Sequence, residues 1–178
     1  MKLVETILEN MTISFSGRIN VLSEQTKQFI GSIVLSDGIL VDANFGQSDG
    51  KKALANLLME SKSNSDISII SEPELLSEND FSFYMEEQAF FKFKNDYFEQ
   101  HDLLRKLRPS KNLVLSLNCK KLDIYTPLSF AEFDAMKLIL LNGSVGEVYN
   151  NSKMLEFDVT KSLISLRKKG IILVKGHA

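Results

Sequence analysis

Residues 29–45, FIGSIVLSDGILVDANF, constrain the fold of this chain more than any other stretch. Two apolar runs flank the dipeptide Asp37-Gly38, and Asp-Gly between such runs is typical of a two-residue hairpin turn. The sequence therefore predicts two antiparallel strands, FIGSIVLS and ILVDANF, joined tightly by that turn.

The segments around the hairpin complete a small sheet with helices packed on it. Residues 2–11 place apolar side chains on one face at helical spacing, and residues 51–60 predict a second helix. Residues 15–21 alternate as a strand does, and residues 67–74 predict a closing strand. Gly17 marks a close backbone approach or a bulge within the first strand.

The next part of the chain, residues 77–125, is rich in aromatic residues and predicts a helical linker that ends before Pro109, followed by an extended stretch over residues 111–125. Phe90, Phe93 and Tyr97 lie on one helical stripe, which favours packing in the core. Phe91 and Phe98 lie off that stripe, and exposed aromatic residues there would mark an interface. The stripe and the off-stripe pair together are the candidate partner-binding residues: Phe90, Phe91, Phe93, Tyr97 and Phe98.

The last part of the chain, residues 126–178, predicts three helices and a terminal strand, the pattern of a winged-helix-like unit. Ser129 and Glu132 fit a capping box at the start of the first of these helices. Asn142-Gly143 and Gly170 predict where the first and third helices stop. The expected fold class is therefore α+β, with boundaries after residues 76 and 125.

Composition narrows the class of protein further. The 178 residues carry a formal net charge of −2, so no whole-chain field would draw the protein to nucleic acid or to an anionic membrane. Acidic residues interrupt the first eleven positions, and a secretory signal would be uniformly apolar there. We expect a cytoplasmic protein without a membrane partner. The single cysteine, Cys119, allows no disulfide within the chain.

The first 76 residues resemble the bacterial PATAN domain, a family long catalogued as a domain of unknown function. The resemblance rests on SGRI at 16–19, DG at 37–38, LVDA at 40–43 and GKKAL at 50–54, in one collinear register. The tail resembles the winged-helix segment that often follows such domains. The resemblance implies a non-enzymatic signalling adaptor without cofactors. Its implied partner is a protein such as a response-regulator receiver or a polarity regulator, and the adaptor is expected to self-associate as a dimer through residues 81–107.

Residues 46–52, GQSDGKK, raise the alternative of a phosphate-binding loop. A Walker A loop needs four residues between its glycines, but three separate Gly46 from Gly50, and Lys52 stands where a hydroxyl should be. The sequence instead predicts a helix that starts here and is capped by Ser48 or Asp49. The two histidines and Cys119 are too scattered to suggest a metal or nucleophile site.

A second alternative is a DNA-binding regulator that uses the third helix of the tail. Basic residues on that helix would contact phosphates: Lys161, Arg167, Lys168 and Lys169. Residues 126–178 hold seven Lys/Arg and five Asp/Glu, and a net of +2 is small for a protein that must hold several phosphates. Glu156 and Asp158 also stand at the start of this helix. The adaptor hypothesis is therefore preferred.

Overall fold

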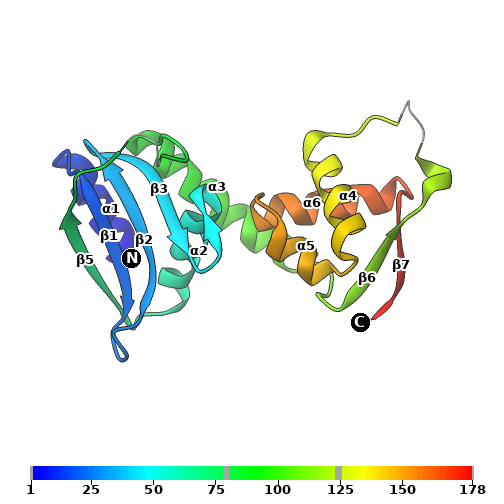
Figure 1. Ribbon diagram of the computed structural model, residues 1–178, viewed down its shortest axis with the longest axis horizontal. Helices are drawn as coiled ribbons and strands as arrows, with labels where there is room; N and C mark the ends of the chain where they lie inside the picture. The colour runs from blue at the N-terminus through cyan, green and yellow to red at the C-terminus, as the bar shows by residue number, and fades with distance from the viewer. Residues whose placement is uncertain (1, 78–80, 123–125, 178) are drawn as a thin grey trace. The chain divides into compact units, whose positions relative to one another are not determined.

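The computed structural model describes residues 2–77, 81–122 and 126–177, and within them the chain is an α+β protein (Figure 1). It divides into two compact units, Met1–Tyr97 and Phe98–Ala178. Positions 78–80 and 123–125, which belong to the predicted linker and its extended stretch, lie outside the described residues. Among the residues described, no helix has the length and hydropathy that crossing a bilayer would require.

The first unit is an antiparallel sheet with helices on it (Figure 1). Its strand order is β4-β3-β2-β1-β5, and each neighbouring pair is antiparallel. The elements are α1 (Lys2–Thr12), β1 (Gly17–Ser23), β2 (Phe29–Ser36), β3 (Ile39–Phe45), β4 (Ser48–Asp49), α2 (Gly50–Ser63), β5 (Ile67–Pro73) and the first part of α3 (Glu87–Arg105).

Local backbone chemistry explains the central hairpin. Asp37 and Gly38 have φ values of 48° and 76°, so both turn residues adopt the positive φ of a two-residue hairpin turn. At Gly17, a Cβ would lie 2.2 Å from the backbone oxygen of Glu72, which confirms the predicted close approach. The inward side chains of β1 and β2, such as Ile19 and Ile33, are fully buried.

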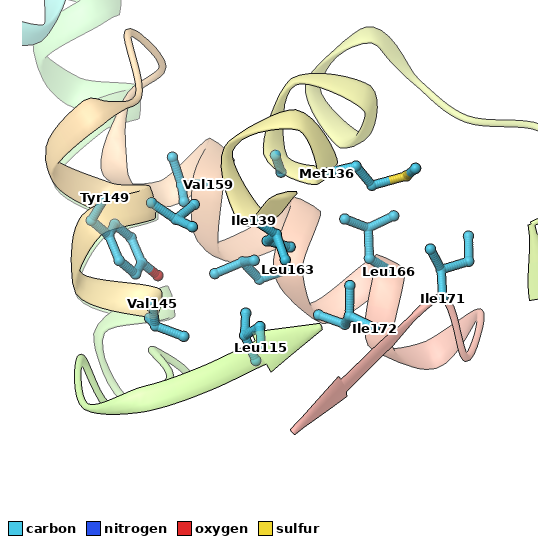
Figure 2. Packing of buried hydrophobic residues seen from close by; sticks show 12 residues of the cluster. Leu115, Met136, Ile139, Val145, Tyr149, Val159, Leu163, Leu166, Ile171 and Ile172 are labelled. Carbon is cyan, nitrogen blue, oxygen red and sulfur yellow. The ribbon is translucent and has the colours of Figure 1, made fainter. Parts of the chain in front are cut away.

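The second unit packs three helices against a two-stranded sheet (Figure 2). Its elements are the end of α3, β6 (Leu113–Leu117), the 3₁₀ turn η2 (Cys119–Lys121), α4 (Phe130–Asn142), α5 (Val145–Asn151), α6 (Glu156–Lys168) and β7 (Ile172–His177). Strand β6 lies inside the predicted linker, yet it pairs antiparallel with β7. Figure 2 shows Leu115 of β6 and Ile172 of β7 facing Leu163 and Leu166 of α6 across this core.

Helix boundaries in the second unit follow the predicted signals. The Ser129 hydroxyl accepts from the backbone N–H of Glu132, and the Glu132 carboxylate accepts from the backbone N–H of Ser129, which confirms the capping box. Helix α4 ends at Gly143, whose φ of 76° suits a helix stop, and Gly170 at φ 70° follows α6 in the same way.

Candidate functional site

The loop at residues 46–52 is a hairpin followed by a helix. Strand β4 pairs antiparallel with β3, so the loop turns back on the strand before it. A phosphate-binding loop instead follows a strand into a helix and lines its backbone N–H groups along the phosphates. Asp49 occupies the N-cap position of α2, but its side chain makes no capping hydrogen bond, and Ser48 lies in β4. The predicted side-chain cap is therefore wrong, and the positive φ of Gly50 makes the turn into the helix.

The candidate aromatic residues of α3 differ in exposure. Phe90 is fully buried and Tyr97 is nearly so, which places both side chains in the hydrophobic interior. Phe93 is half-buried and stacks on Tyr97, with 6.1 Å between ring centroids. Phe98 is half-buried, and Phe91 is exposed, with Lys94 Nζ 5.2 Å from its ring centroid. Of this set, Phe91 offers a partner the most surface.

The candidate DNA-contacting residues of α6 and its end are partly engaged within the unit. Lys169 Nζ donates to Glu132 Oε1 at 2.6 Å and to the backbone oxygen of Pro127 at 2.8 Å. Lys161 Nζ lies 5.1 Å from the ring centroid of Phe157. Arg167 and Lys168 are exposed, and Arg167 also borders the mainly apolar cavity described next.

That cavity, of about 150 Å³, lies between α6 and the two-stranded sheet. Its apolar lining comes from β6, β7, α5 and α6 together with the chain before β6, and includes Leu115, Leu163 and Ile172. Among the described residues that line this cavity, Arg167 is the one that carries a charge. One of the four candidate phosphate contacts is therefore also part of an apolar pocket wall.

The start of α6 is held by a second ion pair. The Arg108 guanidinium donates to both carboxylate oxygens of Glu156, at 2.8 and 3.0 Å, and lies 4.3 Å from the ring centroid of Tyr149. Thr160 donates its hydroxyl proton to the backbone oxygen of Glu156, so Tyr149 must donate in the 2.7 Å bond to Thr160. Burial raises the pKa of Tyr149, and it also raises the pKa of Asp158. This network fixes the first turn of α6.

Glu132 joins α4 to the end of α6. Its side chain is almost completely buried, and burial alone would raise its pKa. Hydrogen bonds from Lys169, from the backbone N–H of Ser129 and from Ser165 outweigh that effect and lower the pKa to about 2. Glu132 is therefore an ionised, fully engaged carboxylate, and it locks the orientation of α4 about its own axis.

The outer face of α4 carries four large apolar side chains that are exposed. Phe130 is 83% exposed, Phe133 59%, and Leu140 and Leu141 71% each. Nine of the thirteen residues of α4 are apolar, so the helix has apolar side chains on the core side and on the outside. A helix that is hydrophobic all round is normally covered on all sides. We call Phe130, Phe133, Leu140 and Leu141 the α4 outer patch.

The sequence prediction missed the α4 outer patch, although the signal is present in the sequence. The stretch FAEFDAMKLILL has more apolar positions than one core-facing stripe needs. The many aromatic residues of α3 predict an interface from the sequence, whereas the surplus apolar positions of α4 predict only a helix.

Side chains that could build a catalytic or metal centre are dispersed. Cys119 is exposed, and His101 is half-buried, with Nδ1 3.4 Å from a carboxylate oxygen of Asp102. Within the described part of the chain, no three His, Cys, Asp or Glu side chains lie close enough together to hold a metal ion. A hollow of about 430 Å³ between α4 and α6 is lined mostly by polar side chains, which include Glu132, Lys161 and Lys169. No protein-family model matches the chain, and neither a curated protein nor a solved structure was found to match it.

Proposed function

We propose that the protein is a non-enzymatic adaptor that acts by binding another protein, as the PATAN resemblance of its first 76 residues implies. The observation that supports this proposal is the α4 outer patch, four large apolar side chains exposed on one helix. Contiguous apolar surface of this kind marks interaction sites because water contact with it is unfavourable. The adaptor works in the cytoplasm within a signalling system, and its partner class is the receiver or polarity regulator that the resemblance implies.

The α4 outer patch suits protein contact better than small-molecule chemistry. The patch is formed by aromatic and aliphatic side chains, and aromatic residues are enriched at protein interfaces. The capping box and the Lys169–Glu132 ion pair hold α4 in one orientation. A preorganised helix face loses little conformational freedom on binding, so more of the contact energy becomes affinity.

A photo-crosslinking amino acid in place of Leu140 tests the proposal in the cells that make the protein. Leu103 on α3 is a matched control position because it is also a helical leucine, 62% exposed, in the same unit. We expect irradiation to give a defined protein adduct from position 140 and none from position 103. Absence of any protein adduct at position 140, or equal adducts at both positions, would contradict the adaptor proposal.

DNA binding through α6 is the alternative, and the exposure of Arg167 and Lys168 keeps it testable. A protein that contacts DNA phosphates through Lys and Arg side chains loses most of its affinity for DNA when those side chains are replaced by acidic ones. A gel shift of promoter-length DNA at moderate salt, abolished by Arg167→Glu together with Lys168→Glu, would favour the regulator over the adaptor. We expect no gel shift with the parent chain or with the double variant.

A further inference from the structure

We propose that the α4 outer patch is the interface of a symmetric homodimer, in which α4 packs antiparallel against α4 of a second copy of this chain. The inference rests on the proposed protein-binding role and names the partner of that same surface. It differs from self-association through the aromatic residues of α3, since the buried members of that set are unavailable to a second copy.

The spacing of the patch defines one continuous helix face. Phe130, Phe133, Leu140 and Leu141 follow one another at steps of three, seven and one residues, with Lys137 between them. At 3.6 residues per turn these side chains fall within about 120° of the helix surface. The opposite side of α4 carries the core residues Ala135, Met136 and Ile139 together with buried Glu132. The outer face is therefore an apolar stripe with one lysine at its middle, about as broad as the stripe that packs a helix onto a core.

The exposed area fits the apolar centre of a dimer interface. At roughly 200 Å² for a large apolar side chain, the four residues expose on the order of 500 Å². A stable interface buries about 800 Å² on each partner, of which the apolar centre is the larger part and a polar rim the remainder. The α4 outer patch supplies that centre, and the polar residues beside it supply a rim.

The charges on this face are what select a second copy as the occupant. Asp134 is half-buried on the flank of the face, and Lys137 is exposed at its middle. When two copies of α4 pair antiparallel about a two-fold axis between positions 135 and 136, Asp134 faces Lys137 of the second copy, twice. The same register places Phe130 against Leu141 of the second copy. One two-fold arrangement thus matches both the apolar ends and the central charges.

The first experiment measures the mass of the purified full chain by sedimentation velocity across a concentration series. We expect a reversible dimer, and we expect Leu140→Glu to weaken it at least tenfold because a carboxylate would be buried in the interface. Leu103→Glu is the matched control and should leave the dimer unchanged. Both positions are exposed, so the far-UV circular dichroism of both variants should match that of the parent chain.

The second experiment tests the register through its charges. Asp134→Lys and Lys137→Asp each bring like charges together at the two-fold axis, and each variant alone should weaken the dimer by about tenfold at low salt. An equimolar mixture of the two variants should form a heterodimer at close to the parent affinity, because every central contact is again between opposite charges. A change that acted only within one copy of the helix would not be rescued by mixing.

The outcomes separate this inference from the adaptor proposal. A chain that stays monomeric at high micromolar concentration, a dimer that Leu140→Glu leaves intact, or variants that do not recover on mixing would overturn the homodimer. If the chain is monomeric and position 140 still crosslinks to a protein of another mass, the occupant is a different protein and the adaptor proposal stands. If position 140 crosslinks only to a second copy of this chain, the homodimer stands and the receiver or polarity regulator of the adaptor proposal must bind at another surface. If position 140 crosslinks to no protein, both fail.

Discussion

Glu132→Gln removes one negative charge from the junction of α4 and α6 while keeping the size of the side chain and an oxygen that can accept from Ser129. The pKa of this carboxyl is lowered from 4.5 to about 2, chiefly by hydrogen bonds that exceed its burial penalty. Each pKa unit corresponds to about 1.4 kcal/mol, so the ionised form of Glu132 contributes roughly 3 kcal/mol to the stability of the second unit. The glutamine variant should lose about that amount at pH 7, since it also leaves Lys169 without its carboxylate.

The pH dependence of this loss follows from the direction of the shift. Because the folded pKa lies below the unfolded one, the contribution is complete above pH 4.5 and disappears as the pH falls toward 2. The difference in unfolding free energy between parent and variant should therefore fall from about 3 kcal/mol at pH 7 to about 1 kcal/mol at pH 2.5. Urea unfolding followed by circular dichroism gives both values, and amide exchange in α4 and α6 assigns them to the second unit.

Glu147→Gln is the matched control. Glu147 also stands three residues after a capping serine, at the start of α5, but its side chain is exposed. Its replacement should change the unfolding free energy by no more than about 0.5 kcal/mol at either pH. A Glu132→Gln effect below about 1 kcal/mol at pH 7, or one that stays the same at both pH values, would refute the buried-carboxylate reasoning.

Three further substitutions test a close backbone approach, a positive φ and a buried hydrogen bond. Gly17→Ala would place a Cβ 2.2 Å from the backbone oxygen of Glu72, so we expect a loss of about 3 kcal/mol or more in thermal unfolding; Gly46→Ala, where a Cβ meets no atom within 4 Å, should lose only about 1 kcal/mol from its positive φ. Tyr149→Phe removes the donor to Thr160 and should cost about 1 kcal/mol in urea unfolding, and an unchanged midpoint would show that this bond adds no net stability.

Much of the fold could be predicted because its signals are local. Asp37-Gly38 specifies a turn in which both residues have positive φ, and Ser129 with Glu132 specifies a helix start through two reciprocal hydrogen bonds. The pairing of β6 with β7 could not be predicted in the same way. Leu115 and Val174 are partners across three intervening helices, and nothing in either strand identifies the other.

The side-chain cap predicted for α2 is wrong for a related reason. Asp49 has the right chemistry, but it pairs in β4 and the next residue, Gly50, enters the helix with a positive φ, and the Asp49 side chain makes no capping hydrogen bond. The candidate site is harder to predict than the fold. An apolar pattern shows how many side chains of a helix are apolar, but it does not show which of them face the core and which stay exposed. The exposed part of α4 is defined by the residues on its other side, Ala135 and Ile139, which lie in the core.

The order of the five strands also has a consequence for how the protein associates. A sheet can recruit a new strand only at an edge, through unpaired backbone groups. One edge is β4, which has two residues and is too short to template a strand. The other edge is β5, which ends in Pro73 and carries the charged Glu72. Both edges of this sheet thus carry features that discourage strand addition, a two-residue strand on one side and a charged residue followed by a terminal proline on the other.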